Sequence, residues 1–275
     1  EAQELVGVGN SANAAVSSAR LGLQSALLTC VGSDIYGQKS IDSLAQDGVI
    51  TDFIHSVQNK KTNYHYVLWF NDERTILINH EIYEYHMPTE LVSNSVPAPK
   101  YIYLSSLGEN SLPFHTEVAT YLKEHPETKL VFQPGTFQIK FGTEALADIY
   151  QHTYIFFCNK EEAVRILKLD TNEDHSIHHL LLELRKLGPK LPVITDGPQG
   201  AYTFDIDVEN LATGTIDETT PVVHLPIYPD PLPPLERTGA GDAFASTFTT
   251  AIIQGKDIHT ALIWGSINSM SVCQQ

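Results

Sequence analysis

"ERTGAGDAFAS", residues 236–246, contains two glycines separated by one alanine. An aspartate follows the second glycine, where an apolar helical pattern begins. A helix start needs an N-cap, which Thr238 or Asp242 could supply. The glycines on either side of Ala240 favour a second interpretation, that another group approaches the backbone closely here. Asp242 as an ordinary N-cap remains the simpler alternative.

The residues after Asp242 predict a helix whose first turn forms an anion site. Amide N–H groups of Gly239, Ala240 and Gly241 would converge at the helix N-terminus, where unpaired donors and the helix dipole favour an anion. A carboxylate beside that site is repelled unless it has another task. Asp242 as general base for a substrate hydroxyl, with the amides holding a transferring phosphoryl group, accounts for both features. The apolar face of the helix comprises Ala243, Phe244, Thr247, Phe248, Ala251 and Ile252.

The composition indicates a folded protein that does not bind nucleic acid. The chain has 275 residues, of which 42% are hydrophobic and 18% charged, enough for a large core. Its net charge of −16 argues against nucleic acid or an anionic membrane as partner, because phosphate contacts need clustered Lys and Arg. A small phosphorylated ligand remains compatible, since backbone amides and Mg²⁺ can meet its charge.

Three widely separated cysteines, Cys30, Cys158 and Cys273, suggest free thiols in a reducing compartment. The sequence contains neither a signal peptide nor an apolar run long enough to span a bilayer. We therefore expect a cytoplasmic protein. The chain begins without Met and stops without a helix-end signal, so we expect it to be truncated at both ends.

Short apolar runs alternate with amphipathic stretches along most of the chain, which predicts a three-layer α/β/α fold with a mostly parallel central sheet. We expect one domain over 1–275. The expected strands are 25–31, 100–106, 129–134, 154–159 and 191–197. The expected helices are 12–21, 37–47, 113–124, 143–150, 160–168 and 175–187.

Residues 62–79, "TNYHYVLWFNDERTILIN", break this alternation with two aromatic and β-branched runs joined by a turn. The pattern predicts a β-hairpin with two apolar faces. We expect it to form a small β lid within 55–85 that covers the substrate and pairs with another lid in a homodimer. Residues 221–234, rich in proline, predict an extended connector.

Two glycine-rich stretches near the N-terminus look like nucleotide motifs. "LVGVGNSANAA", 5–15, formally fits the dinucleotide pattern G-x-G-x-x-A, but its alanines equally suit a helix packed on a sheet. "GSDIYGQKS", 32–40, has Gln38 before the lysine, so the P-loop spacing fails.

"CNKEEAVRIL" places Asn159 and Glu162 where a strand ends and a helix begins. One interpretation is a capping box, with Asn159 as N-cap and Glu162 at N3. The other places both at the carboxyl edge of the sheet, where they hold Mg²⁺ through water or phosphate. "VITDGPQGAY", 193–202, predicts either a hairpin turn or an approach to a nucleotide phosphate.

Taken together, these motifs resemble the ribokinase, or PfkB, family of carbohydrate kinases. Its glycine-rich N-terminal motif is matched by "GVGNSANAAVSSARLG" and "VGSDIYG", and its D-T-T-G-A-G-D-A-F motif by "ERTGAGDAF". "NKEE" matches N-x-x-E, "TDGPQG" matches T-x-G-x-x-G, and "NDERT" is similar to the lid turn. The matches follow the family's order over essentially the whole chain.

The resemblance implies ATP-dependent phosphorylation of a hydroxymethyl group on a sugar or nucleoside, with Mg²⁺. Asp242 would be the base and 239–241 the anion hole, while Asn159 and Glu162 would organise Mg²⁺ and phosphate. The expected nucleotide contacts are Thr195, Gly197, Gly200, Arg237 and Thr238, with Ser266 or Asn268 near the adenine. The expected substrate contacts are Gly9, Asn10, Asn13 and Glu109.

The chain departs from the family pattern in three places. Glu236 and Arg237 replace the Asp and Thr that precede T-G-A-G-D, which leaves activation by a monovalent cation open. "FQPG", 132–135, stands where many relatives have D-P-N. The family's first strand, with its substrate-binding Asp, would lie before Glu1.

Two other functions compete with a sugar kinase. A ligand sensor that kept the fold would have no need of Asp242 beside an anion hole. An NAD-binding oxidoreductase built on "GVGNSA" would leave that aspartate unexplained. A nucleoside kinase is the alternative within the same family.

Overall fold

The computed structural model describes residues 4–70, 73–211, 214, 216–229 and 238–274. The chain divides into two compact units, Glu1–His86 and Met87–Gln275, which are described separately. The boundary falls at the end of the segment expected to form a lid. One domain over 1–275 stays a prediction, because compact units are defined by packing and not by independent folding.

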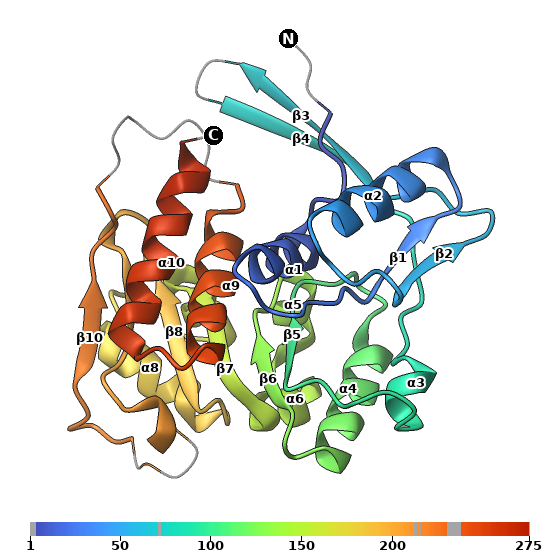
Figure 1. Cartoon of the computed structure of the whole chain (residues 1–275). Coiled ribbons are helices and arrows are strands. Elements are labelled where there is room, and N and C mark those ends of the chain that lie inside the picture. Colours follow the sequence, from blue (N-terminus) through green and yellow to red (C-terminus); the bar gives the residue numbers. More distant parts are fainter. Residues whose placement is uncertain (1–3, 71–72, 212–213, 215, 230–237, 275) are drawn as a thin grey trace. The chain divides into compact units, whose positions relative to one another are not determined.

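The second unit contains a six-stranded sheet in the order β10-β9-β8-β7-β6-β5 (Figure 1). Strands β5 to β8 are parallel, while β9 and β10 continue the sheet in antiparallel pairing. The sheet is therefore mostly parallel, as predicted. The strands are β5 Tyr101–Leu104, β6 Lys129–Phe132, β7 Thr153–Asn159, β8 Leu191–Thr195, β9 Ala201–Phe204 and β10 Val222–Leu225.

Alternate residues of the central strands face two different helix layers. Phe157 of β7 packs on Phe244 and Phe248 of α9, Ala240–Ile253, which lies beside α10, Ile258–Cys273. Phe156, one residue earlier, packs on Tyr150 of α6, Ala147–His152, on the other face. This two-residue period explains why the strands are apolar throughout, because both faces are covered.

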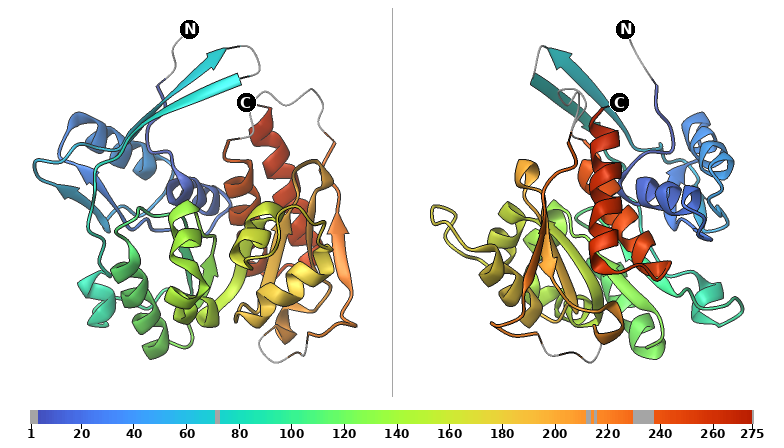
Figure 2. Two further views of the ribbon diagram at one scale, coloured as in Figure 1. Left: turned by 180° about the vertical axis from the view of Figure 1, so that it is seen from behind. Right: turned by 60° about the vertical axis from the view of Figure 1, so that its left-hand side comes forward.

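The remaining helices of this unit cover the face opposite α9 and α10, as the left view of Figure 2 shows from behind. The four-residue α3 lies ahead of the sheet in the chain. The helices are α3 Thr89–Val92, α4 Leu112–Glu124, α5 Thr136–Ala145, α7 Lys160–Ile166 and α8 Ile177–Lys186, and the short 3-10 turns are Gly197–Gln199 and Val208–Asn210.

The first unit has its own small parallel sheet and a separate hairpin. It contains α1 Asn10–Arg20, β1 Thr29–Gly32, α2 Ile35–Gln46 and β2 Ile54–Val57, with β1 parallel to β2. The run 25–31 was expected in the central sheet. It is instead represented by β1, which begins at Thr29 and pairs in a sheet of its own with a strand that the sequence did not predict.

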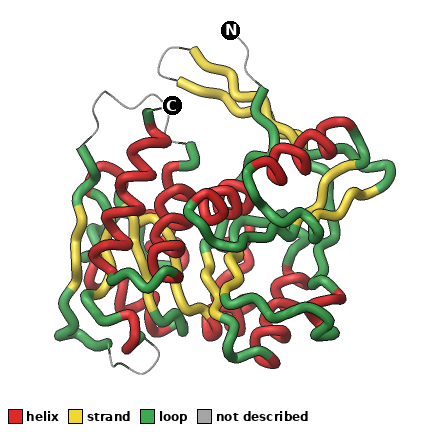
Figure 3. Tube along the Cα trace, viewed as in Figure 1, coloured by secondary structure: helices red, strands yellow, loops and turns green. Residues whose placement is uncertain are grey.

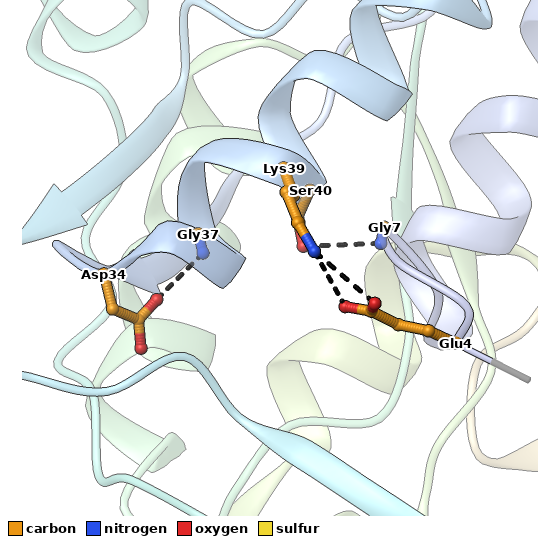
Figure 4. Close-up of polar contacts among 6 residues, drawn as sticks. All are labelled: Glu4, Gly7, Asp34, Gly37, Lys39 and Ser40. Atoms are coloured by element: carbon orange, nitrogen blue, oxygen red, sulfur yellow. Dashed lines mark hydrogen bonds and ion pairs between the residues drawn. The ribbon is translucent and has the colours of Figure 1, made fainter. Parts of the chain in front are cut away.

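Asp34 accounts for the "VGSDIYG" stretch in structural terms. Its carboxylate caps α2 by accepting a hydrogen bond from the Gly37 amide at 2.9 Å (Figure 4), and it accepts two more from the amide and hydroxyl of Thr62. Such a cap stabilises a helix by about 1 kcal/mol. A Cβ on Gly37 would collide with the carbonyl oxygen of Gly32, so this close approach requires glycine.

The hairpin predicted at 62–79 is present. Strand β3, Tyr64–Phe70, pairs antiparallel with β4, Glu73–Asn79 (Figure 3), and residues 71–72 lie outside the described residues. Tyr66 faces Leu77 across the strands, and the two side chains are 62% and 51% exposed. This face also carries the exposed Leu68, so the hairpin presents apolar surface as expected.

Strand β9 pairs antiparallel with β8, which confirms the hairpin-turn interpretation of 193–202, whereas β10 was not predicted from the sequence. Both are four residues long, and β10 lies inside the stretch 221–234 expected to be an extended connector. The prolines of that stretch leave 222–225 free to pair, because Pro221 and Pro226 stand just outside the strand. Within the described residues, no helix is long and apolar enough to cross a membrane.

Candidate active site

Asp242 lies in the first turn of α9, in a position that rules out its role as N-cap. The N-cap is Gly239, with φ of +81° in the left-handed region, and α9 begins at Ala240. The expectation that Thr238 or Asp242 would cap the helix is therefore wrong. The left-handed turn favours glycine, and glycine has no side chain with which to cap the first amides.

The backbone just before Asp242 is not crowded by the described residues. A Cβ added to Gly241 would meet only the Nε2 atom of Gln133, at 4.0 Å. Substitution by alanine would thus fill space beside the backbone instead of colliding with it. These residues fit an anion held by backbone amides at the start of a helix fourteen residues long.

Gln133 is a contact of Asp242 that the sequence did not predict. Its Nε2 atom donates a hydrogen bond to Oδ1 of Asp242 at 3.3 Å, while its Oε1 atom accepts one from the hydroxyl of Tyr103. Gln133 belongs to "FQPG", which stands where many members of the family that the motifs resemble have D-P-N. This difference was the sequence signal that the position is unusual. That departure alone did not indicate the partner.

Asn159 and Glu162 form a capping box at the start of α7. The Glu162 amide donates to Oδ1 of Asn159 at 2.8 Å, and the Asn159 amide donates to Oε2 of Glu162 at 2.9 Å. Burial raises the pKa of Glu162. The structural interpretation of this motif is confirmed.

The same pair fits an indirect role toward Mg²⁺ better than direct coordination. Neither of the two cap bonds uses Oε1 of Glu162, which is therefore the carboxylate oxygen that would face a water or a phosphate-bound ion. Across the part of the chain that the structure describes, no group of three or more His, Cys, Asp or Glu residues could hold a metal by itself. A cation here would need ligands from water or from a phosphate.

The "TDGPQG" stretch forms the turn between β8 and β9. Thr195 ends β8, and the Asp196 amide donates to the Gly200 carbonyl at 2.8 Å. Gly200, with φ of +95°, lies so close to the Leu225 carbonyl that a Cβ would collide with it. Gly197 has a positive φ of +47° but nothing within 4 Å of its Cβ position. Packing therefore explains Gly200, and it leaves Gly197 beside open space.

Ser266 and Asn268 both join α10 to other parts of the second unit. Ser266 Oγ accepts a hydrogen bond from the Tyr228 amide at 2.9 Å. Asn268 Nδ2 donates to Thr247 Oγ1 of α9 at 2.7 Å. These contacts give both side chains a structural task, and their place near an adenine stays a prediction.

The expected substrate residues lie on both units. Gly9 is the N-cap of α1, Asn10 is the first residue of that helix, and Asn13 Oδ1 accepts from the Gly9 amide at 3.4 Å. Glu109 is exposed in the loop between β5 and α4 of the second unit. Thr238 is exposed ahead of α9, and Arg237 lies outside the described residues.

In the first unit, helix α2 contacts the segment that precedes α1. The hydroxyl of Ser40 accepts a hydrogen bond from the Gly7 amide at 3.3 Å, and Lys39 pairs with Glu4 at 3.2 Å (Figure 4). The second pair is exposed and adds little stability. The Gly7 contact gives the glycine-rich "GVGNSA" stretch a packing role within its own unit.

Comparison with known proteins agrees with the fold and the motifs. The chain is 26% identical to the ribokinase of Bacillus subtilis (strain 168) over 269 residues, covering 96% of this chain and 80% of that protein. It is 23% identical to a nucleoside kinase of Methanothermobacter thermautotrophicus over 253 residues, covering 92% and 73%. The structure of Arabidopsis thaliana ribokinase complexed with ribose and ATP has the same fold, with a TM-score of 0.77, 20% identity and coverage of 98% and 81%.

A family model described as pfkB family carbohydrate kinase matches residues 3–275. This match confirms the predicted family, the ribokinase-like three-layer fold and the predicted class of enzyme, an ATP-dependent kinase. The chain therefore belongs to the pfkB family of carbohydrate kinases.

Proposed function

We propose that this protein transfers the γ-phosphoryl group of MgATP to a hydroxymethyl group of a sugar, with Asp242 as the general base. The observation that carries the proposal is the turn at Gly239: a left-handed glycine, open space at Gly241 and a carboxylate in the first helical turn. The family membership supports a carbohydrate acceptor.

The chemistry of the turn follows from its geometry. The amides of 239–241 would stabilise charge on the phosphoryl oxygens, because backbone N–H groups at a helix N-terminus favour an anion. The Asp242 carboxylate would accept the proton of the attacking hydroxyl as the new O–P bond forms, while the bond from the γ-phosphorus to the bridging oxygen breaks and ADP leaves. Phosphoryl transfer depends mainly on positioning and charge stabilisation, which such a turn supplies.

Asn159 and Glu162 would help to hold the Mg²⁺ ion of MgATP. When bound, the ion would neutralise charge on the nucleotide phosphates. The Oε1 atom of Glu162 would hold a water of the ion's shell while Oε2 keeps its cap bond. A monovalent cation requirement is a separate matter that potassium titration of the activity would decide.

The remaining predicted contacts are part of the same proposal. We assign Thr195, Gly197, Gly200, Arg237 and Thr238 to the nucleotide, with Ser266 or Asn268 near its adenine. We assign Gly9, Asn10, Asn13 and Glu109 to the acceptor. A nucleoside acceptor is the second candidate, and the similarity to the Methanothermobacter nucleoside kinase favours it.

The hairpin β3–β4 is our candidate for the lid and for a homodimer contact. Its exposed Tyr66, Leu68 and Leu77 form an apolar face that a second copy of the same hairpin would cover. Cys30, Cys158 and Cys273 are free thiols, which is typical of a reducing compartment such as the cytoplasm.

The test is ADP release from MgATP with a panel of pentoses, hexoses, sugar acids and nucleosides. Release with one class, reduced about 10²- to 10⁴-fold in Asp242→Asn, would support the kinase and identify its acceptor. Asp148→Asn is the matched control, since Asp148 is an exposed aspartate of α6 paired with Lys123. Unchanged turnover in Asp242→Asn would exclude Asp242 as the base.

A further inference from the structure

Gln133 is held at the end of β6 by the sheet itself. Its backbone amide donates to the Leu104 carbonyl at 2.9 Å, which continues the parallel pairing of β5 and β6 beyond Phe132. Val131, two residues earlier, packs in the core cluster formed with α9 and α10, and Tyr103 packs against the same cluster. The strand period therefore directs Gln133 and Tyr103 toward α9.

The hydrogen bonds at Gln133 define which way its side-chain amide points. The Tyr103 hydroxyl donates to Oε1, so Nε2 is turned toward Oδ1 of Asp242. The reversed amide would set its oxygen against the carboxylate, where two acceptors repel. Burial, and to a smaller extent the charge of Asp242, raises the pKa of Tyr103, so its hydroxyl remains a donor at neutral pH.

We propose that Gln133 and Tyr103 are positioning residues that fix the orientation of the Asp242 carboxylate. The proposal rests on the function proposed above, in which Asp242 is the base. Tyr103 comes from β5, Gln133 from the end of β6 and Asp242 from α9, so one chain of hydrogen bonds joins three elements of the second unit and ends at this carboxylate. Among the described residues of those elements, Tyr103 is a titratable group that faces the pair.

A neutral amide suits this task for an electrostatic reason. A donor hydrogen bond stabilises the charged carboxylate, which is the form that accepts a proton. Glutamate has nearly the same shape but would add a second negative charge about one hydrogen bond away from Asp242. That charge would raise the pKa of Asp242 and make the base harder to ionise.

The test compares Gln133→Glu and Tyr103→Phe with the wild-type chain. We expect Gln133→Glu to lower kcat about 10- to 100-fold, because misplacement of a catalytic group by about 1 Å costs up to that much. The KM for MgATP should change less than about twofold if binding is untouched. The acidic limb of the pH profile of kcat/KM should move to higher pH, since Asp242 would lose its proton at a higher pH beside the added carboxylate. Tyr103→Phe should lower kcat less and leave that limb in place.

Two matched variants serve as controls. Tyr101→Phe removes a hydroxyl two residues earlier on β5, where Tyr101 contacts Lys129 and Tyr154 instead of Gln133. Gln151→Glu makes the same charge change at an exposed glutamine. Thermal unfolding of each variant checks the fold. If Gln133→Glu does not fold, the Tyr103→Phe comparison still decides the proposal, because it removes only one oxygen atom.

A readout that does not depend on turnover separates this proposal from the proposed function. The side-chain ¹⁵N and ¹H signals of Gln133 should shift as a carboxylate titrates, and Asp242→Asn should abolish that shift. Active wild-type enzyme with unchanged kinetics in both variants and no such titration would overturn the positioning role alone. An inactive wild type that still shows the titration would overturn the proposed function and leave the contact established.

Discussion

Asn159 and Glu162 each accept a hydrogen bond from the other's backbone amide, at 2.8 and 2.9 Å, and together they begin α7 at the end of β7. This reciprocal arrangement explains "NKEE" without any ligand. It also leaves one carboxylate oxygen outside the box, so structural and functional roles can coexist in one side chain.

Substitutions at Glu162 should separate these two roles. Glu162→Ala should lose one cap bond and about 1 kcal/mol of stability. Glu162→Gln can keep that bond through its amide oxygen, and burial already disfavours the charge there, so its stability should match the wild type. If Glu162 also orients a water of Mg²⁺, the Gln variant should need about 10-fold more Mg²⁺ for half-maximal activity. Urea unfolding and Mg²⁺ titration measure the two effects, and an unchanged Mg²⁺ requirement would confine Glu162 to capping.

The two glycines of "TDGPQG" should differ in what they contribute. Gly200→Ala should destabilise by about 3 kcal/mol or more, because its Cβ would collide with Leu225 in addition to the backbone strain. In Gly197→Ala the new Cβ has no neighbour within 4 Å. The variant should therefore lose only about 1 kcal/mol of stability, from the left-handed backbone conformation. Denaturant unfolding gives the stabilities and an ATP titration gives the affinities. A weaker affinity for ATP in folded Gly197→Ala would support a nucleotide contact, and equal stabilities of the two variants would contradict the packing argument.

The pair Asn268–Thr247 should couple α10 to α9. Asn268→Ala should lower the free energy of unfolding by about 1 kcal/mol, the usual net value of one hydrogen bond. A double-mutant cycle with Thr247→Val checks whether the two side chains act together. Additive losses would mean that the bond contributes nothing. A raised KM for ATP with unchanged stability would instead favour the adenine role.

His115 should make the protein less stable in acid. It is buried on α4, its Nδ1 atom contacts the Ser111 carbonyl at 2.7 Å, and burial lowers its pKa below 6.5. The unfolded chain therefore takes up a proton first as pH falls below about 6.5, and stability declines from there toward the lower folded pKa. His115→Phe should flatten this decline, at some cost from the lost hydrogen bond. Urea unfolding at pH 7.5, 6 and 5 measures this decline, with His179→Gln at an exposed position of α8 as the control, and parallel curves for wild type and His115→Phe would rule His115 out.

The exposed hairpin face should support self-association. If β3–β4 pairs with a second copy, the wild type should sediment as a dimer and Leu77→Glu as a monomer, because a buried unpaired charge is costly. Tyr36→Glu makes a similar change at an exposed apolar residue of α2, outside the hairpin, and should remain dimeric. A monomeric wild type would remove the dimer proposal.

The sequence predicted the parts of the molecule that local pattern determines. Apolar runs indicated β5 to β8, since a strand covered on both faces is apolar throughout, and the hairpin at 62–79 followed from its two β-branched runs. Strand β9 followed only from the hairpin-turn interpretation of 193–202, and β10 was missed because four residues carry too little periodicity to stand out. The glycines pointed to the Asp242 turn.

The contacts of the Asp242 turn could not be predicted from local sequence pattern. Gln133 and Asp242 are 109 residues apart, and only the folded sheet brings them together. The N-cap was assigned wrongly for a related reason: side-chain preference favoured Thr238 or Asp242, whereas the left-handed backbone at Gly239 decides where α9 begins.

Every residue of α9 from Ala243 to Ile252 is buried, and Asp242 is attached directly to the start of this segment. Backbone amides along such a helix exchange with solvent only when the core itself opens. The position of Asp242 in the chain should therefore be lost together with the core of the second unit. When that core melts on heating, slow exchange of the α9 amides and the activity that depends on Asp242 should disappear at the same temperature.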